Sequence, residues 1–163
     1  TLEVKSVKEE EEPVVLLEED CSGFSGANAD QAISDMDLYT QTQGWTATTA
    51  YGTSSASIRV ASGKKTGSVT TPAITSETGV LAVEFDASYY ASDGSSIVVS
   101  ILNGSEVVAK ETVPITAERA TYTLSFDDVP SNCKVMFAST AAKKRFFLYN
   151  VKIMDSESTI SKS

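Results

Sequence analysis

The stretch "RATYTLSF", residues 119 to 126, decides the fold because its side chains alternate between two kinds. Every second residue is apolar or aromatic: Ala120, Tyr122, Leu124 and Phe126. The residues between them are polar or charged: Arg119, Thr121, Thr123 and Ser125. Successive side chains of an extended chain point to opposite faces, so this pattern predicts a half-buried antiparallel strand.

Other segments show the same alternation. In "VLAVEFDA", residues 80 to 87, one face carries Leu81, Val83, Phe85 and Ala87. The segments "SIVVSIL" and "EVVAKE" flank Asn103-Gly104. An Asn-Gly pair accepts positive φ at both central positions of a tight turn, which predicts a hairpin there. We expect further strands at 13–20, 56–61, 66–71 and 133–138.

The stretch "KKRFFLYNVKI", residues 143 to 153, predicts the last strand. Strict alternation places four side chains on its core face: Phe147, Tyr149, Val151 and Ile153. The opposite face then carries Phe146 and Leu148, followed by Asn150 and Lys152. We therefore interpret the aromatic residues as core rather than as a stacking platform for nucleic acid. The three cations at 143–145 lie in the loop that enters the strand.

About nine short strands with polar turns predict an all-β protein, a two-sheet antiparallel β-sandwich with at most one short helix. That helix is expected within "NADQAISDMD", residues 28 to 37, with Asn28 or Asp30 as its cap. It lies in a long polar segment, residues 22–55, where we predict no strand; such loops are often functional. The expected organisation is an acidic arm at 1–12, one domain at 13–155 and a polar tail at 156–163.

Charge and composition limit the class of partner. The 163 residues carry a formal charge of -9, and 41% are hydrophobic, which suits a globular domain. Residues 1–20 account for most of this charge, so we interpret the acidic arm as a solvated linker. No face is basic, and we expect no nucleic-acid partner. No apolar run approaches the ~20 residues that span a bilayer, and "TLEVKSVKEE" lacks the features of a signal peptide. We expect no transmembrane segment, and an export signal outside this chain.

Several catalytic classes lack the residues they need. The chain has no histidine, which removes the commonest general base and the usual zinc ligand. It also has no Walker sequence and no GxGxxG. Glu84 and Asp86 project from one strand face about 7 Å apart, a separation that suits an inverting glycosidase. We favour two outward acids on a hydrated sheet face and expect a protein that is not an enzyme.

The chain has two cysteines, Cys21 and Cys133, and no CxxC motif. They allow one disulfide if the chain is exported. The alternation also turns Cys133 inward beside Val135 and Phe137, where it would be a small buried apolar residue. Both interpretations stay open.

Four phrases follow one another along the chain: "LLEEDCSGF" (16–24), "YTQTQGWT" (39–46), "TGSVTTPAI" (66–74) and "FFLYNVKI" (146–153). Together they resemble the jelly-roll modules of exported, often lipid-anchored surface proteins of Gram-negative gut bacteria, over roughly residues 13–155. Those modules look like carbohydrate-binding modules in fold. The resemblance implies a two-sheet jelly roll at the cell surface, secreted or held as a lipoprotein. Such a domain would bind glycan, mediate adhesion or space the other domains of a surface protein.

The resemblance also implies a structural calcium ion. Its ligands would be acids near the first strand and a carboxylate in a closing "DN" of the last strand. Here Glu18, Glu19 and Asp20 supply the first part and Asn150 the second, but Tyr149 stands where the carboxylate is expected. Calcium takes about six to eight oxygen ligands, so the predicted set of Glu18, Asp20 and Asn150 is incomplete.

Glycan binding needs aromatic platforms for sugar rings and polar side chains for hydroxyl groups. The candidate platforms are Tyr39, Trp45, Tyr51 and Tyr90. A lone tryptophan also suits a core position, whereas Tyr90 continues the outward set of Glu84 and Asp86. We therefore expect a non-catalytic carbohydrate-binding or adhesive domain. The alternatives are a structural spacer without ligand and a glycoside hydrolase that uses the two carboxylates.

Overall fold

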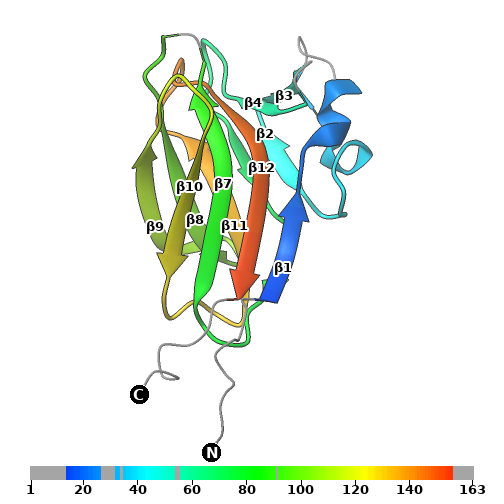
Figure 1. Ribbon diagram of the computed structural model, residues 1–163, viewed down its shortest axis with the longest axis vertical. Coiled ribbons are helices and arrows are strands. Elements are labelled where there is room, and N and C mark those ends of the chain that lie inside the picture. The colour runs from blue at the N-terminus through cyan, green and yellow to red at the C-terminus, as the bar shows by residue number, and fades with distance from the viewer. Residues whose placement is uncertain (1–13, 27–31, 34, 54–55, 91, 156–163) are drawn as a thin grey trace, which may run out of the picture.

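The computed structural model describes residues 14–26, 32–33, 35–53, 56–90 and 92–155, which form two antiparallel β-sheets (Figure 1). The β7/β12 sheet lies in front, in the order β10 (Ala120–Phe126), β7 (Leu81–Tyr89), β12 (Phe146–Asp155), β4 (Ile58–Val60) and β3 (Ala50–Gly52). In this sheet β1 (Val14–Glu19) pairs with the C-terminal half of β12. The β8/β11 sheet lies behind, in the order β2 (Thr46–Thr48), β5 (Ser68–Thr70), β11 (Asn132–Ser139), β8 (Ser96–Asn103) and β9 (Glu106–Pro114), with β6 (Ile74–Thr75) beside β11.

The predicted all-β sandwich is confirmed, although the described residues form twelve strands rather than about nine. The additional strands have two or three residues, too few to show an alternation in the sequence. Two of them, β2 and β3, lie inside segment 22–55, so the prediction that this segment has no strand was wrong.

The described residues contain two short 3₁₀ helices and no α-helix: η2 (Ser22–Gly26) and η3 (Met36–Leu38). Asp35 caps η3, and its side chain accepts a hydrogen bond from the backbone N–H of Asp37. The predicted caps Asn28 and Asp30 lie outside the described residues, so the predicted helix is tested only at its C-terminal end.

The core lies between the two sheets, where the regular strands follow the predicted alternation. Phe85 of β7 is fully buried and packs edge-on against Phe137 of β11, with ring centroids 5.3 Å apart. Tyr122 and Leu124 face the same core but are only partly buried, because β10 is the edge strand of its sheet. Burial of these large side chains supplies the main driving force for the fold.

The last strand departs from strict alternation. A β-bulge between Leu148 and Asn150 inserts one extra residue opposite β7. Beyond the bulge the inward and outward faces exchange, so the buried set is Phe146, Leu148, Val151 and Ile153. The prediction that Phe147 and Tyr149 face the core was therefore wrong, since both lie on the outer face of the sheet.

The predicted hairpin joins β8 and β9, but its turn is shifted by one residue. Asn103 pairs with Glu106, so the two turn residues are Gly104 and Ser105. Only Gly104 has positive φ, at +65°, whereas the Asn-Gly pattern predicted positive φ at two positions. A glycine at the first turn position is what a type II′ hairpin requires.

The predicted arm, residues 1–12, and the predicted tail, residues 156–163, lie outside the described residues, so the domain boundaries stay predictions. Within the described part of the chain, no helix has the length and apolar character needed to cross a membrane.

Cys21 and Cys133 are separate free thiols, and both are buried. Cys133 is thus a small buried residue, as the alternation predicted, and the alternative disulfide is not formed. Burial raises the pKa of the Cys21 thiol well above its ordinary value, and the charges of Glu19 and Asp20 add to this rise. Burial likewise raises the pKa of Cys133.

We expect both thiols to be unreactive in the folded protein, because reaction requires an accessible thiolate. Ellman's reagent at pH 8 should label neither cysteine until denaturant is added, and a reducing agent should leave the urea unfolding curve unchanged. A loss of stability on reduction would contradict the free-thiol assignment.

Candidate functional site

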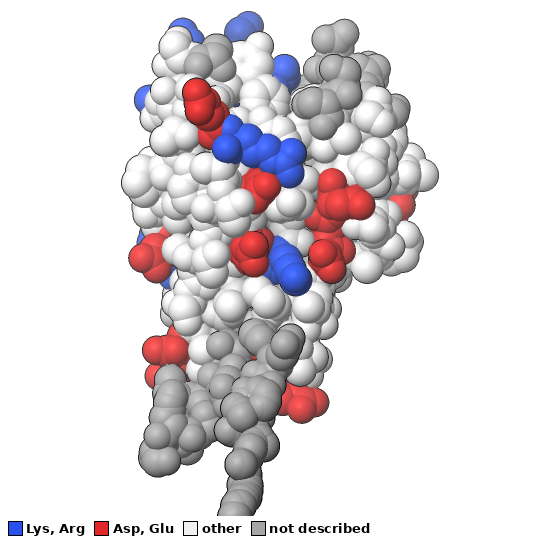
Figure 2. All heavy atoms as spheres, viewed as in Figure 1, with Lys and Arg blue, Asp and Glu red and all other residues white. Residues whose placement is uncertain are grey.

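The outer face of the β7/β12 sheet gathers most of the polar and aromatic candidates. Strand register sets three rows across it. The first row is Tyr51, Arg59, Phe147 and Ser88. The second is Asn150, Asp86 and Thr121, and the third is Glu18, Lys152, Glu84 and Thr123. Figure 2 shows acidic side chains beside arginine and lysine side chains over the middle of this face.

An aromatic–arginine cluster occupies the upper part of the face. The Cζ atom of Arg59 lies 4.3 Å from the ring centroid of Tyr51 and 5.5 Å from that of Tyr90. The Cζ atom of Arg145 lies 4.3 Å from the Tyr90 ring centroid. The ring centroids of Phe147 and Tyr90 are 5.6 Å apart. Each cation–π contact contributes about 0.5–2 kcal/mol, so the five side chains fix one another in place.

The ion pair between Asp93 and Arg145 holds Tyr90 beside this cluster. Arg145 donates from Nε to one carboxylate oxygen at 2.8 Å and from Nη2 to the other at 3.1 Å. The Tyr90 N–H also donates to the Arg145 carbonyl at 3.0 Å. The hydrogen bond from Arg145 lowers the pKa of Asp93, and the Asp93 carboxylate raises the pKa of Arg145. The loop from β7 to β8 is thereby clamped to the start of β12.

Tyr149, the bulge residue, continues the aromatic surface toward β10. Its hydroxyl lies 2.9 Å from Ser88 Oγ, and the Arg119 Cζ lies 4.5 Å from its ring centroid. Arg119 in turn donates from Nε to Asp86 at 2.9 Å, and the Thr121 hydroxyl donates to the same carboxylate at 2.6 Å. Tyr149 therefore lies across the sheet, and its ring covers Ser88, which is only 3% exposed.

A cleft of about 250 Å³ lies below Tyr149, between β1, β12 and β7. Its polar walls come from Glu18, Glu19, Asp20, Glu84, Asp86, Asn150 and Lys152. Lys152 is the partner of Glu84 and of Glu18 across the strands, so its ammonium group offsets part of the acidic charge. The cleft and the aromatic cluster occupy neighbouring parts of one face.

The residues predicted to bind calcium do not fit a calcium site. Strand alternation sends Glu19 inward, where its carboxylate accepts from the N–H groups of Gln41 and Cys21. Asp20 accepts from the Ser22 N–H, and Asn150 accepts from the Asp86 N–H. In the described ranges no three acids, cysteines or histidines are gathered as metal ligands.

The pKa values of the two acids at the end of β1 shift in opposite directions. Desolvation raises the pKa of Glu19, and the hydrogen bonds from Gln41 and Cys21 offset only part of the rise. Hydrogen bonds from Ser22 lower the pKa of Asp20. Glu19 thus serves to fix the turn after β1, while Asp20 stays ionised at the rim of the cleft.

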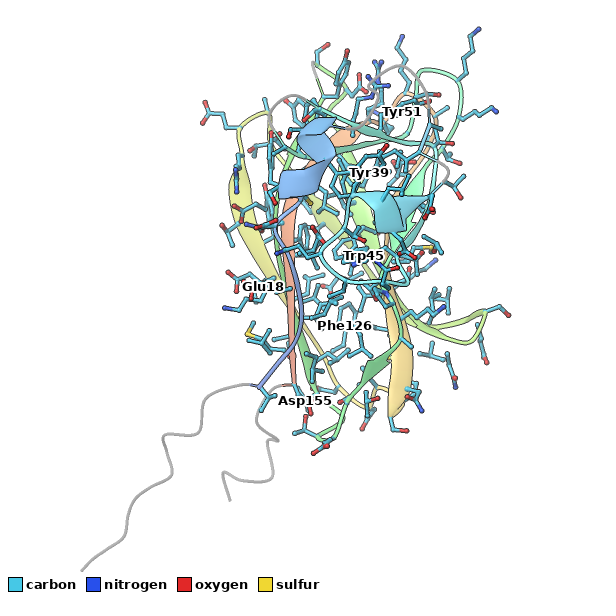
Figure 3. All side chains as sticks on the ribbon, turned by 90° about the vertical axis from the view of Figure 1, so that its right-hand side faces the viewer. Glu18, Tyr39, Trp45, Tyr51, Phe126 and Asp155 are labelled. Atoms are coloured by element: carbon cyan, nitrogen blue, oxygen red, sulfur yellow. The ribbon has the colours of Figure 1, made fainter. Side chains whose placement is uncertain are left out.

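The structure brings together only two of the four predicted glycan platforms, Tyr51 and Tyr90. Trp45 is 3% exposed and lies between the sheets, so it belongs to the core (Figure 3). Its indole Nε1 donates to Thr42 Oγ1. Tyr39 packs against Phe24 and is partly buried against the core. Trp45 thus takes the core position that a lone tryptophan also suits and is not a platform, and Tyr39 lies apart from the cluster.

Four residues of the face were missed by the sequence prediction: Arg59, Arg119, Phe147 and Tyr149. The alternation in "SIRV" could have placed Arg59 outward, because Ile58 and Val60 both face the core. Phe147 and Tyr149 were assigned to the core because the bulge in β12 leaves no mark in the sequence.

The carboxylates of Glu84 and Asp86 share the outer face, as predicted, but their surroundings do not suit acid catalysis. A glycosidase acid is a carboxyl group kept protonated by an apolar or anionic environment. Asp86 instead forms an ion pair with Arg119, and Lys152 lies opposite Glu84 in the register. Each carboxylate therefore lies beside a cation and not in the apolar or anionic surroundings that such an acid needs.

Comparison with solved structures finds this fold among carbohydrate-binding modules (CBMs). BiXyn10A CBM1 in its apo form is 17% identical, with a TM-score of 0.56, over 88% of this chain and 99% of that one. The CBM22-1 xylan-binding domain of Paenibacillus barcinonensis Xyn10C is 13% identical, with a TM-score of 0.54, over 90% and 97%. A CBM4 structure is 15% identical, with a TM-score of 0.51, over 71% and 96%.

At these identities the likeness concerns the fold, and it confirms the predicted jelly-roll sandwich. No protein-family model and no curated protein matches the sequence.

Proposed function

We propose that this protein is a non-catalytic carbohydrate-binding domain whose binding surface is the outer face of the β7/β12 sheet. The observation that carries the proposal is the cluster of Tyr51, Arg59, Tyr90, Arg145 and Phe147, in which partly buried aromatic rings alternate with arginines on the outer face of one sheet. Sugar rings stack on such rings, and planar polar side chains bind the hydroxyl groups.

The neighbouring cleft supports the same assignment. A glycan chain that lies on the aromatic cluster would extend over Tyr149 toward the cleft walls, where Asn150 and Lys152 offer hydrogen-bonding groups to hydroxyls. The shared fold with carbohydrate-binding modules agrees with this role.

The setting of the domain is part of the proposal. We infer that it acts as a binding or adhesive module of an exported surface protein. This inference rests on the resemblance in sequence and on the acidic arm, which suits a solvated linker to an anchor or a second domain.

The binding surface can be tested with Tyr90→Ala. We expect this substitution to weaken binding to the preferred glycan about tenfold or more, because Tyr90 contacts Arg59, Arg145 and Phe147 at once. Binding would be measured by a glycan array followed by calorimetry on the full chain, with circular dichroism to check the fold.

The matched control is Val107→Ala, on β9 of the opposite sheet, where the side chain is 46% exposed. It should bind as the wild type does. Equal losses in both variants would place the ligand elsewhere, and a wild-type chain that binds no glycan would favour the structural spacer.

A further inference from the structure

Three arginines lie on the proposed binding face, and two of them are neutralised. Arg145 pairs with Asp93, and Arg119 pairs with Asp86. Arg59 has no carboxylate partner among the described residues, and its contacts are with the rings of Tyr51 and Tyr90. It is therefore the one arginine of this face, within the described ranges, whose charge is uncompensated.

One hydrogen-bond donor of Arg59 is also unused. Its Nε atom is buried and has no hydrogen-bond partner within the described part of the chain. Guanidinium N–H donors lie in the plane of the group, whereas cation–π contacts use its charge and the ring faces. The rings of Tyr51 and Tyr90 therefore stabilise the charge of Arg59 but accept no hydrogen bond from its N–H groups.

Such a guanidinium suits a planar anion. A carboxylate accepts two parallel N–H bonds from one arginine, and the bond is strengthened by both charges. The tyrosine rings beside Arg59 supply apolar surface for the sugar that carries the carboxylate. The charge, the free donor and the stacking surface of Tyr51 and Tyr90 thus meet at Arg59.

We propose that Arg59 binds the carboxylate of a uronic acid, so that the ligand is an acidic polysaccharide. This inference rests on the proposed carbohydrate-binding function and specifies its substrate class. Of the three arginines only Arg59 can take this role without breaking an existing ion pair.

The net charge of -9 does not oppose this assignment locally. Of the acids of the cleft, Asp86 is paired with Arg119. Glu84 lies four residues along β7 from Ser88, in the row of Arg59, a separation of roughly 13 Å. At physiological ionic strength, exposed charges are screened beyond about 8 Å. Arg59 therefore acts largely independently of the remaining acids of the cleft.

The test compares each acidic polysaccharide with its carboxyl-reduced form, in which the uronic acids become neutral sugars on the same backbone. The probes are polygalacturonate, alginate and glucuronoxylan, titrated into the full chain in 0.15 M salt. We expect at least one of them to bind about tenfold or more tighter than its reduced form.

Two variants assign that preference to Arg59. Arg59→Gln should abolish it, while Arg59→Lys, which keeps the charge but not the paired donors, should retain only part of it. Lys110→Gln on β9 is the control, since it changes the net charge equally on the opposite sheet and should leave the preference intact.

Equal binding of the acidic and reduced forms by the wild-type chain would overturn the role of Arg59 while leaving the carbohydrate-binding function in place. The same holds if Lys110→Gln loses the preference as fully as Arg59→Gln does. A chain that binds neither acidic nor neutral glycans would refute the proposed function itself.

Discussion

Replacing Asp155 with alanine should lower the free energy of unfolding by about 3 kcal/mol, because it removes a buried carboxylate that closes one end of the sandwich. Asp155 is 6% exposed and lies at the end of β12, at the end of the molecule opposite Tyr51 in Figure 3. It accepts hydrogen bonds from Ser76 Oγ at 2.7 Å, the Glu77 N–H at 2.7 Å and Thr78 Oγ1 at 2.9 Å. Without it, these donors of the loop before β7 lose their acceptor, and Ser76 among them is buried.

The effect of Asp155 should depend on pH in a defined direction. Burial by itself raises the pKa of Asp155, but the hydrogen bonds from Ser76, Glu77 and Thr78 outweigh it and hold the pKa below its ordinary value. The unfolded chain therefore binds a proton more readily than the folded one. Stability from this group is fully present above the unfolded pKa of about 3.9 and is lost as the pH falls through the folded pKa.

Urea unfolding of the wild type and of Asp155→Asn, at pH 7 and at pH 3, measures the contribution of Asp155. The difference in unfolding free energy between the two proteins should be large at pH 7 and shrink at pH 3. The wild type alone would not isolate Asp155, because Glu19, whose pKa is raised by burial, changes the stability with pH in the opposite direction. Glu19 is present in both proteins, so its effect cancels in their difference. Its protonation adds stability as the pH falls through its raised pKa toward the unfolded value of about 4.3.

Asp127→Ala is the matched control for Asp155→Ala. Asp127 is exposed, and its side chain forms no hydrogen bond within the described structure. Its loss should therefore change the free energy of unfolding by less than about 0.5 kcal/mol. Similar effects of the two substitutions would mean that net charge, rather than the buried hydrogen bonds, sets the stability.

The second large effect is expected at the clamp between Asp93 and Arg145. Asp93→Ala should lower the free energy of unfolding by about 2 kcal/mol. The side chains of Asp93 and Arg145 are only 6% and 20% exposed, and the substitution would remove the acceptor of three N–H donors of Arg145. Since Arg145 also contacts the Tyr90 ring and accepts from its N–H, glycan binding should weaken in the same variant.

A comparison with the exposed pair tests the reason. Arg119 is 52% exposed, so Asp86→Ala should cost no more than about 1 kcal/mol of stability. A double-mutant cycle on Asp93 and Arg145 should give a coupling energy of about 1.5–3 kcal/mol. A coupling near zero would show that the bidentate geometry contributes nothing beyond surface charge.

The sequence predicted the regular strands well because their two faces meet different environments. Leu81, Val83 and Phe85 point into the core as their alternation required. The prediction failed at β12, where one extra residue between Leu148 and Asn150 exchanged the faces. A bulge needs no special residue type, so the alternation of "FFLYNVKI" did not predict the one in β12.

Local composition left the role of Trp45 open between the core and a binding platform. The tryptophan follows a polar, glycine-containing segment typical of a binding loop, yet it is buried beside β2. The burial of Trp45 depends on side chains of other strands that pack against it, and the residues of the segment itself do not indicate which side chains these are.

The sequence by itself determined a sandwich of antiparallel strands and most of its core, because the period of a strand is local and hydrophobic burial acts on each strand in the same way. Only the tertiary structure decided the binding face. Tyr51, Arg59, Tyr90 and Phe147 come from segments far apart in the chain, and the strand order β3-β4-β12-β7 makes them neighbours. Strands pair through backbone hydrogen bonds that are common to all residues, so that order follows from the packing of the whole domain and not from any one segment.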